Sequence, residues 1–190
     1  MTHEPLIAFE QVTAGYRQPV VGPASFEVRT GEVIGLTGDN GSGKSTLLGV
    51  LTGRAQLISG QIRRRPGLRI AFQRQDPLAV RGLPLRAGEL LRAAGALHSA
   101  PAALRPLLGR RADALSGGQL QLLHVWAALG GDGHLIVLDE PTNNMDRQGV
   151  TALADVLKAP LPDRGVLLVT HDHALLSAVC GRTVEVARWS

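Results

Sequence analysis

The sequence predicts an α/β fold whose central sheet is largely parallel. Short apolar runs typical of buried strands alternate with helix-patterned segments from residue 33 onward, and a glycine-rich loop joins the first such strand to the first helix. Alternating apolar and polar residues near the N-terminus predict antiparallel strands that precede this core. The chain has 190 residues, 44% of them hydrophobic, so a single domain spanning 1–190 is expected.

Each predicted element rests on a local pattern. Half-buried strands are expected from alternation at 6–13 and 24–29, a buried strand at 33–37, and a helix at 44–51. Residues 77–114 are rich in Leu, Ala, Arg and Pro, and prolines at 84, 101 and 106 interrupt their helical stretches, which predicts a small helical insertion. Further along, the patterns predict helices at 118–129, 147–157 and 172–179, and strands at 135–138, 166–169 and 183–186.

Composition narrows the range of partners. The formal net charge is +4, which is compatible with phosphate, a lipid surface or RNA, although a basic solvated surface explains it equally well. Aromatic residues make up only 3% of the chain, few for a surface that stacks single-stranded nucleic acid. No secretory signal and no apolar run of about 18 residues is found, so any membrane role is expected to come through a partner. The single cysteine, Cys180, excludes an internal disulfide and fits a reducing cytosol.

A phosphate-binding loop (P-loop) is predicted after the strand at 33–37. Residues 38–46 match the pattern G-x-x-x-x-G-K-[ST], between a buried strand and a helix as the pattern requires. The glycines let backbone N–H groups surround a phosphate, and Lys44 would reach the β- and γ-phosphates while Ser45 offers a hydroxyl to Mg²⁺. The nucleotide-binding residues expected here are Gly38, Asp39, Asn40, Gly41, Ser42, Gly43, Lys44, Ser45 and Thr46.

Two carboxylates follow the buried strand at 135–138. Ligands of open α/β sheets bind at the carboxyl ends of the strands, where Asp139 and Glu140 are expected to lie. Asp139 is suited to the Mg²⁺ shell, and Glu140 to polarising the attacking water as a general base.

The sequence Leu-Ser-Gly-Gly-Gln at 115–119, together with these two motifs, resembles the nucleotide-binding subunits of ABC transporters, whose signature it is. The resemblance implies the ABC cassette form of the P-loop NTPase fold, with a parallel core sheet, an N-terminal antiparallel β subdomain and the short helical insertion. It also implies a head-to-tail homodimer or heterodimer that encloses two ATP molecules. In that dimer the γ-phosphate held by the opposite subunit is contacted by Ser116, Gly117, Gly118 and Gln119.

The remaining family motifs occur in order. Tyr16 matches the aromatic residue that stacks on adenine, although a lone tyrosine is also common in a core. Asp146 lies in the segment that orders the dimer interface, and His171 matches the histidine that orients the catalytic water. The Mg²⁺-sensing glutamine is either Gln73 or Gln75, and alignment with the family strand favours Gln75. Mg²⁺ is therefore expected on Ser45, Asp139 and Gln75, with Glu140, His171 and Lys44 as the catalytic residues.

The sequence departs from the family on the helix after the signature. Residues 120–127 lack the usual arginines, and core packing is the expected role of His124 and Trp126. The function expected is ATP hydrolysis that drives a membrane permease from the cytoplasmic face, and residues 60–75 look most like subunits for zinc or manganese uptake. Residues 139–146 also resemble ribosome-associated ABC proteins, which leaves a non-transport ATPase as the alternative. The basic run at 63–65 is too short to indicate RNA, so no direct nucleic-acid binding is expected.

Overall fold

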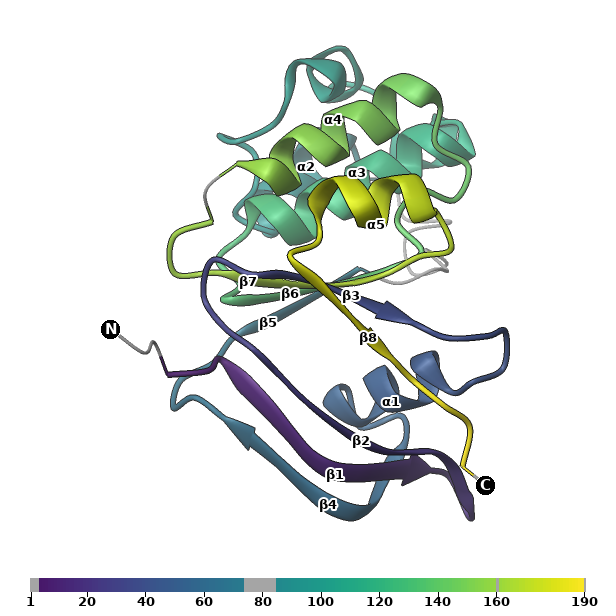
Figure 1. The fold of residues 1–190 in the computed structure, drawn as a ribbon. Coiled ribbons are helices and arrows are strands. Elements are labelled where there is room, and N and C mark those ends of the chain that lie inside the picture. The colour runs from purple at the N-terminus through teal and green to yellow at the C-terminus, as the bar shows by residue number, and fades with distance from the viewer. Residues whose placement is uncertain (1–3, 74–84, 160, 190) are drawn as a thin grey trace.

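Two sheets organise the chain in the computed structural model, which describes residues 4–73, 85–159 and 161–189. A five-stranded parallel sheet has the order β5-β6-β7-β3-β8, and a three-stranded antiparallel sheet has the order β2-β1-β4 (Figure 1). The parallel sheet comprises β5 (Ile70–Gln73), β6 (Leu135–Asp139), β7 (Gly165–Val169), β3 (Val33–Thr37) and β8 (Arg182–Glu185). The antiparallel sheet comprises β2 (Pro19–Val28), β1 (Ile7–Gly15) and β4 (Gln56–Arg64).

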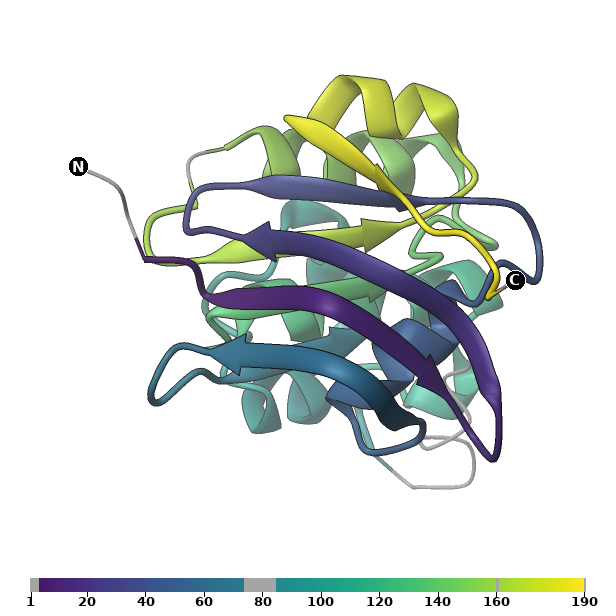
Figure 2. The same cartoon turned by 60° about the horizontal axis from the view of Figure 1, so that its bottom comes forward.

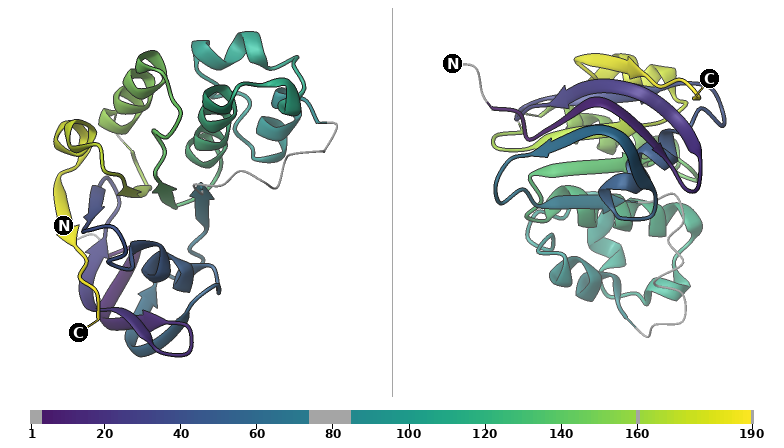
Figure 3. Two further views of the ribbon diagram at one scale, coloured as in Figure 1. Left: turned by 90° about the vertical axis from the view of Figure 1, so that its right-hand side faces the viewer. Right: turned by 90° about the horizontal axis from the view of Figure 1, so that it is seen from below.

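The helices cover the parallel sheet on both sides. On one side α1 (Lys44–Leu51) lies between this sheet and the antiparallel sheet, and Figure 2 shows the antiparallel sheet curving across that side of the molecule. Among the described residues, four helices cover the other side, seen from two further directions in Figure 3. They are α2 (Ala87–Ala93), α3 (Gly117–Gly130), α4 (Arg147–Lys158) and α5 (His173–Val179).

Two hydrophobic clusters follow from this layering. One joins β1, β2 and α1 to one face of the parallel sheet, and the other joins α2 to α5 to the opposite face. Strands β3, β6 and β7 contribute to both clusters because their side chains alternate between the two faces. Their sequences are therefore continuous apolar runs, which explains why all three could be predicted.

The predicted fold class is confirmed, with differences at particular elements. Strand β2 begins at Pro19 instead of residue 24, and β4 has no counterpart among the patterned strands because almost its whole length is exposed. Of the expected helical insertion, residues 85–114 are described. They form α2 and two 3-10 turns, η2 (Ala102–Leu107) and η3 (Ala112–Ala114), and Pro106 lies inside η2.

The topology brings three chain segments to one edge of the parallel sheet. In the order β6-β7-β3, Asp139 pairs with Val169, and Val169 pairs with Leu36. The residues that follow each strand therefore emerge side by side at the carboxyl edge. Within the described ranges, no helix is both long enough and apolar enough to cross a bilayer.

Candidate active site

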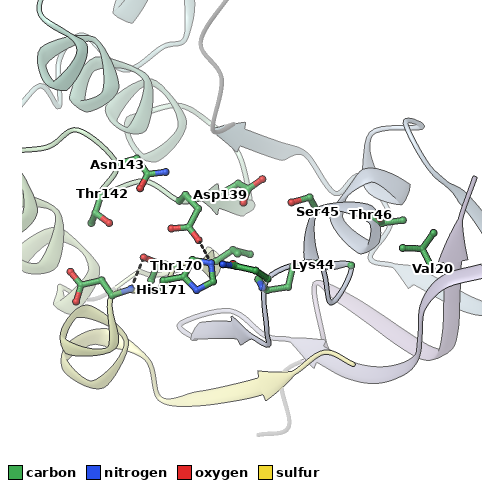
Figure 4. A pocket seen from close by; sticks show the side chains of 15 residues that line it. Val20, Lys44, Ser45, Thr46, Asp139, Thr142, Asn143, Thr170 and His171 are labelled. Carbon is green, nitrogen blue, oxygen red and sulfur yellow. Dashed lines mark hydrogen bonds and ion pairs between the residues drawn. The ribbon is translucent and has the colours of Figure 1, made fainter. Parts of the chain in front are cut away.

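A cavity of about 750 Å³ opens at this carboxyl edge. In Figure 4 the labelled side chains of the P-loop reach it from one side, and those of Thr142, Asn143 and His171 from the other. The cavity is lined by Val20, Asn40, Gly41, Gly43, Lys44, Ser45, Thr46, Asp139, Glu140, Thr142, Asn143, Val169, Thr170, His171 and Asp172.

Two glycines of the P-loop are required by its path. Gly38 has a φ of 141°, and a Cβ there would lie 2.4 Å from the carbonyl oxygen of Val186. Gly43 has a φ of 96°, and a Cβ there would lie 2.5 Å from the side chain of Val21. Larger residues would push the loop away from Val186 and from β2, so the sequence pattern has a steric cause.

The P-loop is arranged to hold an anion. Lys44 is only 8% exposed, and its Nζ donates hydrogen bonds to the carbonyl oxygens of Gly38 (2.6 Å) and Asp39 (3.0 Å). The hydroxyl of Ser42 is buried and makes no hydrogen bond with any residue that the structure describes. Helix α1 begins at Lys44, so its N-terminal amides and the ammonium group face the same cavity. A buried cation and a helix N-terminus at this cavity together fit a nucleotide phosphate chain.

The acidic pair occupies two different environments. Burial raises the pKa of Asp139 above its ordinary value, Glu140 raises it further, and the ammonium of Lys44 acts in the opposite direction. Glu140 is 8% exposed and has a φ of 49°, and its amide donates to the carbonyl of Val169 (2.8 Å). His171 Nε2 lies 3.3 Å from Glu140 Oε1. The turn after β6 therefore directs one carboxylate toward the P-loop lysine and holds the other beside an imidazole.

The raised pKa of Asp139 predicts a gain in stability when the charge is removed. The folded state binds the Asp139 proton more tightly than the unfolded chain does, so the free energy of unfolding falls as pH rises from about 3.8 through the raised pKa. Asp139→Asn stays neutral and avoids that loss. We expect the nucleotide-free variant at pH 8 to melt about 2–4 °C above wild type, which corresponds to about 1 kcal/mol.

Thermal melting at pH 4 and pH 8 without nucleotide or Mg²⁺ measures this effect. The difference between variant and wild type should be larger at pH 8. Asp155→Asn, on the exposed face of α4, is the control and should show no such difference. A lower melting temperature for Asp139→Asn at pH 8 would show that the buried charge stabilises the fold.

His171 follows β7 in a short turn that starts α5. The hydroxyl of Thr170, which is 4% exposed, accepts a hydrogen bond from the amide of Asp172 (3.1 Å). Asp172 in turn caps α5, because its carboxylate accepts from the amide of Leu175 (2.9 Å). These two hydrogen bonds fix the backbone of the turn that bears the His171 imidazole.

The signature residues line a second, smaller cavity of about 310 Å³. Ser116 caps α3: its hydroxyl accepts from the amide of Gln119 (3.3 Å), and its own amide donates to the side chain of Gln119 (3.1 Å). This cavity is lined by Ser116, Gly118, Gln119, Leu122, Asn144, Met145, Asp146 and Gly149. None of its residues lines the P-loop cavity. Within one chain the structure therefore keeps the signature cavity apart from the cavity lined by Asp139 and Glu140.

Tyr16 and Gln73, which the sequence also singled out, line neither cavity. Tyr16 lies in the turn between β1 and β2 and is 56% exposed, so it is not a core residue. Gln73 ends β5 and is 2% exposed, whereas Gln75 lies outside the described residues. The expected core packing of Trp126 is confirmed, since it is 9% exposed inside the cluster that joins α2 to α5.

Several residues of the site were not predicted from the sequence. Val20, Thr142, Asn143 and Thr170 line the P-loop cavity, and Gln121 is buried behind it. Thr142, Asn143 and Thr170 adjoin motif residues, so extending each motif to the whole turn would have found them. Val20 and Gln121 lack such a signal because tertiary contacts alone bring them there.

The fold and the site define a P-loop nucleotide-binding protein: a glycine-rich loop with a buried lysine faces acidic residues across the carboxyl edge of a parallel sheet. Comparison with known proteins narrows this class. Residues 21–143 match the family model described as "ABC transporter". The chain belongs to the ABC transporter ATP-binding family.

Curated relatives agree over most of the chain. The zinc import ATP-binding protein ZnuC of Paracoccus denitrificans (strain Pd 1222) is 38% identical over 185 residues, which cover 91% of this chain and 72% of the relative. The protein of the same name from Alkalilimnicola ehrlichii (strain ATCC BAA-1101 / DSM 17681 / MLHE-1) is 37% identical over 171 residues, or 85% of this chain and 66% of the relative. The chain is an ATP-binding subunit of an ABC transporter and an ATPase.

Solved structures share the fold. An ATP-binding subunit of an ABC transporter superposes with a TM-score of 0.78 at 24% identity, covering 96% of this chain and 86% of that chain. An archaeal ribosome recycling factor, solved with a ribosomal stalk protein, gives 0.81 at 24% identity, covering 97% and 37%. At this identity the likeness concerns the fold alone. The family match and the curated relatives favour transport over the ribosome-associated alternative.

Proposed function

We propose that residues 1–190 act as one ABC cassette that binds Mg²⁺-ATP, pairs head-to-tail with a second cassette and drives zinc import through a membrane permease. The helical insertion at 77–114 belongs to this cassette. The subunit acts on the inner face of the membrane, where it is bound to the permease. It depends on that partner for contact with the membrane because its described part has no membrane-spanning helix. Zinc is the cargo named for the relatives at 37–38% identity.

In the proposed site the P-loop amides and Lys44 bind the β- and γ-phosphates, and Tyr16 stacks on adenine. Mg²⁺ would be held by Ser45, Asp139 and Gln75, and it supplies neutralisation of phosphate charge. The hydroxyl of Ser45 and the carboxylate of Asp139 line the same cavity, and hard oxygen ligands of this kind suit the ion.

Glu140 removes a proton from the attacking water, and His171 orients that water and the γ-phosphate. The 3.3 Å distance between His171 Nε2 and Glu140 Oε1 supports this division, since one small molecule can contact both groups. Most of the barrier lowering comes from positioning and electrostatic stabilisation of the transferred phosphoryl group.

One observation supports the proposed head-to-tail dimer. Ser116 and Gly118 present a helix N-terminus, a natural anion site, in a cavity that shares no residue with the P-loop cavity. A second copy turned head-to-tail would supply that N-terminus to the γ-phosphate from the opposite side, with Asp146 at the interface. Each ATP would then be held by the P-loop of one chain and the signature of the other.

Mixing two inactive variants tests this arrangement. Lys44→Ala disables the P-loop and Ser116→Arg blocks the signature, so each alone should hydrolyse little ATP. In a mixed head-to-tail dimer one site combines the intact P-loop of one chain with the intact signature of the other. The mixture should therefore regain about a quarter of wild-type activity, by the statistics of pairing in a symmetric dimer. If the mixture is no more active than its components, the two motifs do not act in trans.

The proposed cargo has its own test. A strain that carries Lys44→Ala on the chromosome is expected to stop growing when zinc is chelated. Added zinc should restore growth, and added manganese should not. Rescue by manganese instead would assign the other metal, and normal growth under chelation would contradict metal import.

A further inference from the structure

Gln121 is a buried polar residue in an apolar part of α3. It is 4% exposed, and its neighbours Leu120 and Leu123 belong to the hydrophobic cluster. Its side-chain Nε2 donates hydrogen bonds to the carbonyl oxygens of Glu140 (3.3 Å) and Pro141 (3.1 Å). Both acceptors belong to the turn that carries the catalytic carboxylate.

The turn at Glu140 needs such support. Glu140 has a positive φ of 49°, a conformation that non-glycine residues rarely adopt and that persists only when the surroundings hold it. One side is held by the bond from the Glu140 amide to the carbonyl of Val169 on β7. The other side is held by Gln121, whose amide group has the two donors needed for two adjacent carbonyls.

Helix α3 also packs closely against the continuation of the same turn. A Cβ at Gly118 would lie 2.2 Å from the carbonyl oxygen of Asn144, so only glycine permits this approach. Gly118 and Gln121 are three residues apart on one face of α3 and contact the two ends of the segment 140–144. Helix α3, whose N-cap is Ser116, therefore contacts the segment 140–144 at both of its ends.

We infer that Gln121 is a positioning residue that holds the Glu140 carboxylate in its reactive orientation and couples it to the position of α3. The inference rests on the proposed role of Glu140 as general base. Because the signature lies at the start of α3, a shift of that helix on contact with a nucleotide moves the carboxylate of the same chain through Gln121.

Gln121→Met is the direct test, because methionine keeps the length and volume of glutamine and lacks the N–H donors. We expect the kcat of ATP hydrolysis to fall about 10- to 100-fold, as misplacement of a catalytic group does, while KM and the Kd for ATP stay within about twofold. Trp126→Phe, on the same helix but remote from the turn, is the control for disturbed packing and should keep its kcat.

A double variant separates positioning from general damage. If Gln121 acts only through the Glu140 carboxylate, adding Gln121→Met to Glu140→Gln should not lower the residual rate any further. A residue with a merely structural role would lower both backgrounds equally, and that result would overturn the inference. If Gln121→Met does not fold, Gln121→Leu provides the same comparison, since leucine is also apolar and has no hydrogen-bond donor.

The outcomes also separate the proposed role of Glu140 from the inferred role of Gln121. Unchanged hydrolysis in Glu140→Gln would remove the proposed role of Glu140, whatever Gln121 does. A large loss in Glu140→Gln combined with a wild-type kcat in Gln121→Met or Gln121→Leu would overturn the inference about Gln121 alone.

Discussion

Glu140→Gln is expected to lower ATP hydrolysis by about 10³-fold, within the range for loss of a general base, and to leave the Kd for ATP within about twofold. Glutamine has the shape of glutamate, so the turn held by Val169 and Gln121 should keep its path. The amide cannot accept the proton of the attacking water, and this chemical difference is the source of the loss. Removing a buried negative charge close to the phosphates should, if anything, strengthen nucleotide binding.

Steady-state phosphate release measures the rate, and calorimetry with ATP measures the affinity. Because hydrolysis no longer reopens the proposed dimer, the variant should also elute as a dimer when ATP and Mg²⁺ are present. Glu185→Gln, which removes the same charge from an exposed position on β8, is the matched control and should behave as wild type. Near-normal hydrolysis by Glu140→Gln would assign the base to another group.

How much of the fold could be predicted depended on how local each signal is. Strands β3, β6 and β7 are buried on both faces and read as apolar runs, whereas β4 is exposed at nearly every position and carries no period to detect. Alternation predicts a strand only at 24–29, whereas β2 begins at Pro19 and pairs with β1 through an irregular register.

The same distinction applies to the site. The P-loop and the acidic pair are contiguous in sequence, and their meeting follows from the rule that parallel strands end at one edge. The sequence places Gln121 only in a helix that lacks the family's arginines. Its hydrogen bonds to Glu140 and Pro141 join residues 19 and 20 positions apart, and neither partner's sequence context indicates the other.

Lys44→Ala is expected to raise the Kd for ATP about 100-fold or more, equivalent to about 3 kcal/mol, because charge-assisted bonds to phosphate are lost. Lys44 is buried, and its Nζ donates hydrogen bonds to two backbone carbonyls of the P-loop. The ammonium group is thus fixed beside the loop amides. Its removal also leaves Asp139 without the cation that opposes the rise of its pKa, so the carboxylate is harder to ionise for Mg²⁺.

The only other lysine in the sequence provides the control. Lys158 lies in the last turn of α4, far along the chain from the P-loop, and Lys158→Ala should bind ATP as wild type does. Lys44→Arg separates charge from fit: it keeps the positive charge, but a planar guanidinium cannot occupy the place of a compact ammonium between Gly38 and Asp39. Weak ATP binding by both Lys44 variants would show that geometry matters as well as charge, whereas full binding by Lys44→Arg would show that charge alone suffices. Wild-type affinity in Lys44→Ala would mean that the loop amides bind the phosphates without the lysine.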